Sequence, residues 1–534
     1  MVEDWYKEKD EEIRKPRELV MGQFLRRSAD RYPDRLAVVY QDRRYTYREF
    51  NAHVNRMANS LIALGVKKGE RVGIFAHNSD YCVMAALAVA KAGGMFIPMN
   101  FRLVGHEAEY ILNFSEAVAV FVDYPILDVI VGIRDQLQAK HIIVMRSAGV
   151  IPDGMLHFAD LLDKGGEQEP PVEVWEGDLV GLAQTGGTTG HPKGVLVGHR
   201  HICSVIYQIC FIHNYREEDR GLHAMPAYSS AGIAYDWGAT LFHGGTLYIA
   251  PLPPFDPVAM LEIIHQERIN HMTLAPIMLD FILAFMEASP GKYDVSCVRT
   301  LISVGAPTSQ KTREKAVVLF GEGVLYVEYS ATEMGVATCL KPDEVLKYPA
   351  SCGRTALGQE IKIVDMNGKD LPRGEVGEIV VAGQMVTRGY NKNPEANRQA
   401  FFGRYMGIGD MGYMDAGGYI YIVDRKSDMI ISGGMNIYPA EIEAVMINHP
   451  QIAEVAVIGV PDDQWGENVK AIVRLQPGQE ATGEDVIAWC KGKMAGYRVP
   501  KSIDFVADFP RTAAGKVQKS VLRKAYWEGV GRKI

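Results

Sequence analysis

Thr185-Gly186-Gly187-Thr188-Thr189-Gly190-His191-Pro192-Lys193-Gly194 is a stretch of ten residues with four glycines, three threonines and one lysine. Apolar Leu182 precedes it and apolar Val195 follows it, so the local pattern predicts a strand, a glycine-rich loop and a second strand. Glycine lets backbone N–H groups approach an anion closely, and threonine hydroxyls and a lysine ammonium add donors and positive charge. The stretch therefore predicts a loop that binds phosphate.

This loop differs from a Walker P-loop, which places Gly-Lys-Ser/Thr directly before a helix. Here Pro192 precedes the lysine, Gly194 follows it, and a strand is expected next. A surface turn is the alternative for such a run of glycine and threonine. The stretch resembles the Thr-Ser-Gly-Thr-Thr-Gly-x-Pro-Lys-Gly loop of the adenylate-forming enzymes, which include acyl-CoA synthetases, peptide-synthetase adenylation domains and firefly luciferase. Gly186 stands where that family usually has serine.

The composition is that of a globular protein with more than one domain. The chain has 534 residues, 47% hydrophobic and 23% charged, and a net charge of -8 without a basic block, which argues against a nucleic-acid partner. Its seven cysteines are scattered and lack metal-ligand spacing, as expected of reduced thiols in a cytoplasmic protein. We expect no signal peptide, because a charged stretch without an apolar core follows Met1-Val2-Glu3-Asp4-Trp5. We expect no transmembrane segment, because the apolar segment 81–99 is interrupted by Lys91 and two glycines.

The first half of the chain alternates between predicted strands and helices. Strands are expected at 36–40, 72–76, 95–98, 117–122, 141–145 and 301–304, with a turn at 41–44 and helices at 46–64 and 79–92. The first helix begins with a Thr46–Glu49 capping box and ends at Gly65. Its predicted buried stripe is Phe50, Val54, Ala58, Leu61 and Leu64. Strand–helix–strand order predicts a parallel sheet in an α/β fold.

The pattern changes after about residue 425. A helix is expected from Pro439, an antiparallel strand pair at 454–460 and 468–475 around a turn at 461–463, a helix capped by Thr482, a strand at 502–506 and a helix at 518–527. These elements predict a small α+β domain. Together with the resemblance, they predict a large N-terminal domain of mixed sheets flanked by helices, residues 1–425, and a small mobile α+β domain, residues 426–534.

Tyr329-Ser330-Ala331-Thr332-Glu333 resembles the family's Tyr-Gly-x-Thr-Glu motif. The resemblance implies that Tyr329 stacks on adenine, Thr332 contacts the α-phosphate and Glu333 binds Mg²⁺. An aromatic ring offers a stacking face, and Mg²⁺ on phosphates is commonly held by one or two carboxylates. The alternative is an ordinary strand end at which Glu333 is a solvated charge.

Further matches imply the rest of the nucleotide site. Val304-Gly305-Ala306-Pro307 resembles a turn that borders adenine and the acyl group, and Ile408-Gly409-Asp410 resembles a Thr-Gly-Asp whose aspartate binds ribose. Arg425, at the expected domain junction, would reach the ribose too; a surface ion pair with Asp410 is the alternative. The expected nucleotide- and cofactor-binding residues are Thr185, Gly186, Gly187, Thr188, Thr189, Gly190, Lys193, Gly305, Ala306, Pro307, Glu328, Tyr329, Ser330, Asp410, Ile422, Arg425, Gly433 and Gly434.

Three features of the small domain come from the same resemblance. The family pivots this domain two residues beyond the junction arginine, which is Ser427 here. Gly433 and Gly434 lie in a Ser-Gly-Gly-x-Asn-Ile-x-Pro segment that lines the channel for the CoA pantetheine. Lys516 ends a Pro-Arg-Thr-x-x-Gly-Lys segment and is implied to be the catalytic lysine, acting with Thr332 and Glu333; a solvated terminal lysine is the alternative.

The segment Pro226–Gly232 resembles the family's Pro-Leu-Phe-His-x-x-Gly, which contacts the acid, with serine at 229 in place of the usual histidine. The candidate substrate residues are Tyr228, Ser229, Gly232, Tyr235, Trp237, Val304 and Val327, with Ile233, Ala234, Ile277, Met278 and Ala306 as further pocket walls. Each of them could instead belong to the core. Because no arginine or lysine is among them, the pattern favours an apolar monocarboxylic acid that is aromatic, alicyclic or medium-chain.

These matches imply a two-step ligase with a small carboxylic acid, ATP, Mg²⁺ and CoA as partners. The carboxylate would attack the α-phosphate to give acyl-AMP and pyrophosphate, and the CoA thiol would then give acyl-CoA and AMP, in either direction. A monomer and a homodimer both stay open. Two other functions also stay open. The acyl group could be transferred to a carrier protein instead of CoA. The chain could also be a degenerate protein that only binds a nucleotide or an acyl group, which the departures from the family motifs at Gly186, Ser229, Ser330 and Ser427 would support.

Overall fold

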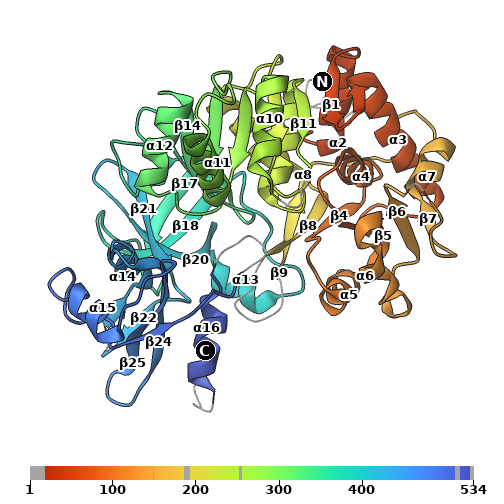
Figure 1. The fold of residues 1–534 in the computed structure, drawn as a ribbon. Coiled ribbons are helices and arrows are strands. Elements are labelled where there is room, and N and C mark those ends of the chain that lie inside the picture. The colour runs from red at the N-terminus through yellow and green to blue at the C-terminus, as the bar shows by residue number, and fades with distance from the viewer. Residues whose placement is uncertain are drawn as a thin grey trace, which may run out of the picture. The chain divides into compact units, whose positions relative to one another are not determined.

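The computed structural model describes residues 18–147, 149–185, 193–251, 255–433, 435–511 and 517–528. These residues form two compact units: one within 18–185, 193–361 and 381–406, the other within 362–380 and 407–528. The fold is α/β, with a large mixed sheet, flanking helices and a smaller C-terminal domain, as predicted (Figure 1). The domain boundary at 425/426 stays a prediction.

A seven-stranded sheet lies in the first unit, in the order β7-β6-β5-β3-β4-β8-β9. Neighbouring strands are parallel as far as β8, and β9 pairs with β8 antiparallel. The strands are β3 (Arg71–Phe75), β4 (Met95–Met99), β5 (Ala117–Asp123), β6 (His141–Met145), β7 (Leu156–His157), β8 (Leu179–Thr185) and β9 (Lys193–Gly198). The helices between them are α4 (Asp80–Lys91), α5 (Gly105–Phe114), α6 (Leu127–Val131) and α7 (Phe158–Lys164). The predicted parallel sheet is confirmed.

A mixed sheet in the same unit has the strand order β16-β15-β14-β13-β12-β10-β11-β1-β2. Its central pairs are parallel, and β2, β15 and β16 join antiparallel. The strands are β1 (Leu36–Tyr40), β2 (Arg43–Thr46), β10 (Arg220–His223), β11 (Thr246–Ile249), β12 (His271–Leu274), β13 (Thr300–Ser303), β14 (Leu325–Ala331), β15 (Gly335–Leu340) and β16 (Gly353–Thr355).

Helices of the first unit pack on one another as well as on the sheets; α3 lies beside α4, and α11 beside α12 (Figure 1). They are α2 (Met21–Arg31), α3 (Tyr47–Ala63), α8 (His199–Ile212), the π-helix η4 (Gly232–Gly238), α9 (Ala239–His243), α10 (Pro257–Glu267), α11 (Pro276–Ala288), α12 (Gln310–Phe320) and α13 (Pro394–Ala400). Short strand β19 (Phe401–Phe402) pairs with β20 (Tyr405–Met414).

Helix α3 follows its sequence signals closely. Thr46 Oγ1 accepts from the Glu49 N–H at 3.3 Å, and Glu49 Oε2 accepts from the Thr46 N–H at 2.8 Å, so the predicted capping box is confirmed. The predicted stripe is fully buried from Phe50 to Leu61. Gly65 ends the helix with φ +91°, a conformation that glycine adopts without strain.

The predicted four-residue turn after β1 is wrong in its length. Gln41, with φ +55°, and Asp42 alone form the turn, and β2 returns antiparallel to β1. Arg43 Nε donates to Asp80 Oδ2 at 2.7 Å, and the Tyr45 hydroxyl donates to the same oxygen at 2.8 Å. The strand is thus held by a carboxylate on α4, too far along the chain for a local pattern to reveal.

Two buried histidines on α8 make stability depend on pH. His199 Nδ1 accepts from the Met21 N–H at 3.2 Å, and burial lowers the pKa of His199 and of His201 to about 4. The unfolded chain protonates these rings below about pH 6.5. Their contribution to stability is therefore complete above pH 6.5 and is lost as the pH falls toward 4.

We expect the thermal midpoint to fall steeply between pH 6.5 and pH 4, measured by scanning calorimetry in buffers of equal ionic strength. The fall should be shallower in His199→Asn, because asparagine keeps an acceptor for Met21 but does not titrate. A midpoint that stays level over this range in the wild-type protein would contradict the expectation.

The C-terminal elements follow the predicted α+β pattern with one shift. Pro461 pairs with Glu467 and Asp462 with Gly466, so the turn lies at 463–465 rather than at the predicted 461–463. The elements are β17 (Gln359–Val364), β18 (Gly377–Gly383), β21 (Tyr419–Arg425), β22 (Ile430–Ser432), β23 (Met435–Ile437), α14 (Pro439–Met446), β24 (Ile452–Asp462), β25 (Gly466–Leu475), α15 (Gly483–Cys490), β26 (Ser502–Phe505) and α16 (Lys519–Trp527). Asp462 Oδ1 closes the turn by accepting from the N–H groups of Gln464 and Trp465.

All seven cysteines are free thiols, as expected. Burial raises the pKa of Cys82 to about 12, so this thiol is unreactive at neutral pH. Within the described ranges, no helix is both long enough and apolar enough to span a bilayer.

Candidate active site

Strands β8 and β9 carry the two ends of the predicted phosphate loop. Thr185 ends β8 and pairs with Lys193, which begins β9. The two predicted strands are therefore confirmed, and the lysine begins a strand rather than a Walker-type helix. Gly186, Gly187, Thr188, Thr189 and Gly190 lie outside the described residues.

Tyr390 links the lysine of this loop to the predicted magnesium carboxylate. Lys193 Nζ lies 5.0 Å from the centre of the Tyr390 ring, and the Tyr390 hydroxyl donates to Glu333 Oε1 at 3.1 Å. Glu333 is 7% exposed, and its carbonyl accepts from the Thr387 N–H at 2.8 Å. Glu333 is therefore not a solvated charge. Sequence reasoning missed Tyr390, because 57 positions separate it from Glu333.

The turn between β14 and β15 carries Thr332 and Glu333. Thr332 Oγ1 lies 2.8 Å from Ser230 Oγ. The threonine that is predicted to contact phosphate therefore touches the segment Pro226–Gly232, which is predicted to contact the acid and is called the acyl segment below. Gly335 follows with φ +64°, and a Cβ there would lie 2.8 Å from the Val205 side chain. Only glycine permits this close turn. Tyr329, on β14, is buried, and Ser330 is half-buried.

Ser229 lies just before the π-helix η4 and contacts its first residue, Gly232. Its hydroxyl donates to the Pro226 carbonyl at 2.7 Å and accepts from the Gly232 N–H at 3.0 Å. A Cβ on Gly232 would lie 2.4 Å from the Pro226 carbonyl oxygen, so glycine is required there. The serine that replaces the family's histidine therefore uses its hydroxyl to shape the acyl segment.

Glu328 and Tyr235, predicted to bind nucleotide and substrate, bind each other in the interior. The Tyr235 hydroxyl donates to Glu328 Oε2 at 2.7 Å, and His213 Nε2 lies 3.0 Å from Glu328 Oε1. The Tyr215 hydroxyl donates to the Tyr235 carbonyl at 2.8 Å. Burial raises the pKa of Tyr235 well above its usual value. These side chains form a buried polar network beneath Tyr329.

Asp236 is also occupied within the protein. Its Oδ2 accepts from the N–H groups of Ala224 and Met225 at 3.1 and 2.9 Å and lies 3.0 Å from His223 Nδ1. Burial raises the pKa of Asp236, and its donors act in the opposite direction. The carboxylate thus fixes the end of β10 against η4.

Replacing Asp236 with alanine is expected to lower the free energy of unfolding by about 3–5 kcal/mol, because two amides and an imidazole would be buried without a partner. Asp236→Asn keeps one acceptor oxygen and is expected to lose less. The urea midpoint measures both variants against Asp163→Ala, an exposed position on α7. Equal midpoints for Asp236→Ala and Asp163→Ala would refute this role.

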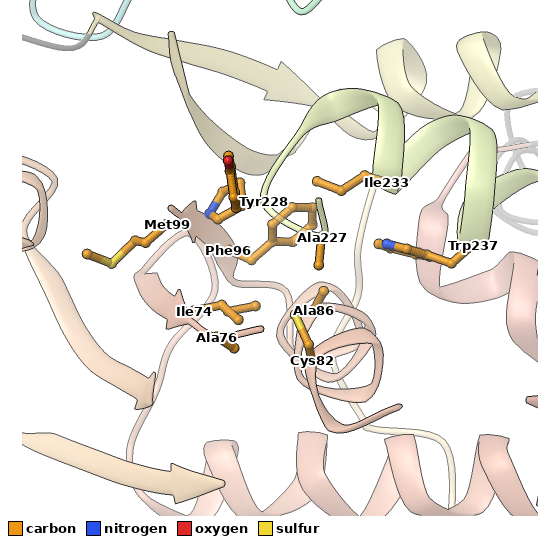
Figure 2. Close-up of a pocket in the computed structure, with 11 residues that line it drawn as sticks. Ile74, Ala76, Cys82, Ala86, Phe96, Met99, Ala227, Tyr228, Ile233 and Trp237 are labelled. Atoms are coloured by element: carbon orange, nitrogen blue, oxygen red, sulfur yellow. The ribbon is translucent and has the colours of Figure 1, made fainter. Parts of the chain in front are cut away.

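An apolar cavity lies where the acyl segment meets α4 and strands β3 and β4 (Figure 2). It is lined by Ile74, Ala76, Cys82, Ala86, Phe96, Pro98, Met99, Ala227, Tyr228, Ile233 and Trp237. Sequence analysis predicted Tyr228, Ile233 and Trp237. It missed the walls from β3, α4 and β4, which only the tertiary structure brings to the acyl segment.

The remaining predicted wall residues divide between core and surface. Val304 directly follows β13 and is 1% exposed, and Val327 lies on the paired strand β14 and is 4% exposed. Gly305, with φ +92°, and Pro307 are exposed, and Ala306 is half-buried. Ile277 is 52% exposed on α11. Apart from Tyr228, Ile233 and Trp237, the predicted wall residues are absent from the lining formed by described residues.

Asp410 and Arg425 meet in the second unit. They are partners in the register of β20 and β21, and Arg425 Nε lies 2.5 Å from Asp410 Oδ1. The aspartate side chain is 6% exposed and the arginine side chain 50%. A nearly buried acceptor and an exposed donor thus stand side by side, as the ribose prediction requires. Ile422 is exposed on the same strand β21.

Contacts on both sides bracket the predicted hinge, Ser427. Lys426 Nζ donates to Glu378 Oε2 at 2.8 Å. Arg523 of α16 donates to the Ser427 carbonyl at 2.6 Å and to Asp428 Oδ1 at 2.9 Å. The two neighbours of Ser427 are therefore held by other elements, whereas the Ser427 side chain is exposed.

Gly433 lies at the β22–β23 turn with φ +57°. Its N–H donates to the Trp465 carbonyl at 2.8 Å, and a Cβ would lie 2.7 Å from the Trp465 ring. Glycine is therefore needed for this close approach. Gly434 and Lys516 lie outside the described residues.

The chain matches the AMP-binding enzyme family over residues 25–391 and the C-terminal domain of AMP-binding enzymes over residues 441–516. It is 32% identical to a feruloyl-CoA synthase of an Amycolatopsis species, across 95% of this chain and 99% of that protein. It is 34% identical to a long-chain-fatty-acid–CoA ligase of Mycobacterium tuberculosis, across 95% and 98%.

Among solved structures, the ATP-bound crystal structure of MatB from Rhodopseudomonas palustris is similar, with a TM-score of 0.85 and 29% identity over 96% of this chain and 100% of that one. The motifs quoted from the sequence thus fall inside matches that extend over nearly the whole chain. This protein belongs to the AMP-binding enzyme family and is an AMP-forming acyl-CoA synthetase, which uses ATP to ligate a carboxylate to CoA.

Proposed function

We propose that this synthetase activates an apolar monocarboxylic acid, aromatic, alicyclic or medium-chain, with Mg·ATP and transfers the acyl group to CoA. The observation that carries the proposal is the apolar cavity. Two of its lining residues, Tyr228 and Ile233, lie on either side of Ser230 in the sequence, and the Ser230 hydroxyl contacts Thr332. Among the described residues, no charged side chain lines the cavity. A second carboxylate on the acid would be buried there without a partner, at a cost of several kcal/mol.

The cavity is almost closed in this conformation. Its free volume is about 10 Å³, which is room for about one water molecule. Acid binding therefore requires side chains of the lining to move aside. Met99 is well suited to this, because its unbranched side chain adapts to irregular space at small cost.

The phosphate groups of ATP would be bound by the glycine-rich loop with Thr185 and Lys193, and the α-phosphate by Thr332. Tyr329 would stack on adenine, beside the turn from Gly305 to Pro307. Support comes from the strand pair that holds the loop ends, and from the contacts that join Lys193 and Glu333 through Tyr390.

Mg²⁺ fits Glu333. The described part of the chain holds no group of three or more histidine, cysteine, aspartate or glutamate side chains that could hold a metal by themselves. One carboxylate with phosphate oxygens as the other ligands is an ordinary Mg²⁺ site. The bound ion would neutralise phosphate charge, while Tyr390 orients the Glu333 carboxylate through Oε1.

Asp410 and Arg425 would bind the two ribose hydroxyls, the first as acceptor and the second as donor. Their contact at 2.5 Å pre-arranges the pair. Because Asp410 is nearly buried, little side-chain entropy is lost when it binds.

Lys516 would bridge the attacking carboxylate and the α-phosphate, so that its ammonium offsets the charge that builds on phosphorus. The small domain, 426–534, would then turn at Ser427. This turn would withdraw Lys516 and bring the Gly433–Gly434 segment to the pantetheine arm. The anchored neighbours Lys426 and Asp428 support Ser427 as the pivot, because they would confine the backbone rotation to the residue between them, and the hydrogen bond from Arg523 to the Ser427 carbonyl would move or break during the turn.

The test is release of pyrophosphate across a panel of carboxylic acids with Mg·ATP, each with and without CoA. We expect turnover that requires CoA and favours one class of apolar acid. Dicarboxylic acids should be poor substrates. Preference for a dicarboxylic acid would overturn the proposed substrate class. A single burst of pyrophosphate that is indifferent to CoA would instead indicate a carrier-protein acceptor.

A further inference from the structure

Tyr228 lines the apolar cavity and ends in an isolated polar group, its hydroxyl. Its oxygen is buried, and no hydrogen-bond partner for it exists among the described residues. A phenol buried without a partner is unfavourable, because its hydrogen bonds to water are lost and not replaced. By contrast, the hydroxyls of Ser229 and Tyr235 are both hydrogen-bonded within the protein.

The surroundings of this hydroxyl are aromatic and positively charged. Figure 2 shows the Tyr228 ring beside Phe96 and Met99, with its oxygen at the end of the ring away from Cys82 and Ala86. Phe101 packs against the Tyr228 ring edge to face, with ring centres 5.8 Å apart. Arg102 lies over Phe101, 5.1 Å from its ring centre.

We propose, on the basis of the proposed function, that the Tyr228 hydroxyl selects an acid whose apolar tail carries one acceptor oxygen: a hydroxyl, an ether or a carbonyl. The tail would fill the cavity and extend along the Tyr228 ring as far as its hydroxyl, which would donate a hydrogen bond to the oxygen of the tail. This refines the substrate class from a plain apolar acid to a singly oxygenated one.

An acceptor is favoured over a donor for two reasons. Burial raises the pKa of Tyr228, while Arg102 lowers it, so the phenol keeps its proton at neutral pH and can donate. The positive charge of Arg102 favours the negative end of a bond dipole near the hydroxyl. A full carboxylate is disfavoured, because the cavity lining itself offers no cation.

The experiment compares kcat/KM for matched acids in three enzymes. One series is phenylpropanoic acid and its three monomethoxy isomers; the other is octanoic acid and its oxo derivatives, with the oxo group at successive carbons. The enzymes are wild type, Tyr228→Phe and Tyr293→Phe. Tyr293 is a matched control, because its hydroxyl is also buried without a partner but lies outside the cavity lining.

In wild type, at least one oxygenated acid should exceed its parent in kcat/KM by roughly 10- to 100-fold. Tyr228→Phe should bring that ratio close to one, and Tyr293→Phe should keep the wild-type ratio. The ratio is taken within each enzyme, so a general loss of activity cancels.

Two outcomes would overturn the inference while leaving the ligase intact: wild type prefers the parent acids at every position, or Tyr228→Phe keeps the wild-type preference, in which case the hydroxyl binds only water. If wild type turns over none of the acids, parent or oxygenated, the proposed substrate class itself fails.

Discussion

Replacement of Lys516 by alanine is expected to slow acyl-adenylate formation by about 10²–10³-fold. Loss of one charge-stabilising donor at a phosphoryl centre typically costs this much. Transfer of the acyl group from supplied acyl-AMP to CoA should continue near the wild-type rate, because Lys516 would be withdrawn during that step. Acid-dependent exchange of labelled pyrophosphate into ATP measures the first step, and thioester formation from synthetic acyl-AMP measures the second.

Lys524→Ala is the matched control for Lys516→Ala. Lys524 is an exposed lysine on α16, eight positions further along the chain, and both half-reactions should stay at wild-type rates in this variant. Equal slowing of the two half-reactions in Lys516→Ala would remove Lys516 from the adenylation step.

The second large effect is expected for Glu333→Gln. Glutamine keeps the size of the side chain and can still accept from the Tyr390 hydroxyl, but it lacks the charge that holds Mg²⁺. We expect kcat to fall by about 10²-fold and the Mg²⁺ concentration for half-maximal rate to rise. Steady-state rates over a magnesium titration measure both quantities.

Tyr390→Phe separates the charge of Glu333 from its orientation. This variant loses the 3.1 Å hydrogen bond to Glu333 Oε1 but keeps the carboxylate, so the magnesium dependence should stay closer to wild type than in Glu333→Gln. If Glu333→Gln shows the wild-type magnesium dependence, the proposed metal contact is wrong and Glu333 acts only through the turn between β14 and β15.

Local sequence was sufficient wherever a structure depends on neighbouring residues. The Thr46–Glu49 capping box, the strands on either side of the glycine-rich loop and the stop at Gly65 are in the structure as predicted. Each depends on hydrogen bonds or backbone freedom within a few positions. Of the two errors, the one at β2 concerns a strand held by Asp80, which lies outside the local window. The turn after β24 is closed locally by Asp462, and the sequence analysis placed it two residues too early.

The site divides in the same way. The motifs that resemble the family's predict Lys193, Thr332, Glu333, Asp410 and Arg425 as contacts of phosphate, magnesium and ribose, and these contacts stay predictions. Sequence order also indicated that the acyl segment begins at Pro226. The sequence by itself therefore determined the enzyme family, and it predicts the residue types that would contact ATP.

Only the tertiary structure decided which side chains face one another. It placed Tyr390 on Glu333, turned Tyr235 inward onto Glu328, and left the Tyr228 hydroxyl unpaired in a cavity built largely from β3, α4 and β4. The physical reason is that burial and hydrogen-bond satisfaction depend on atoms brought together from distant parts of the chain. The local sequence around a tyrosine does not reveal whether its hydroxyl has a hydrogen-bond partner. In the proposed substrate site, the hydrogen bonding of the Tyr228 hydroxyl bears on which acid this enzyme selects.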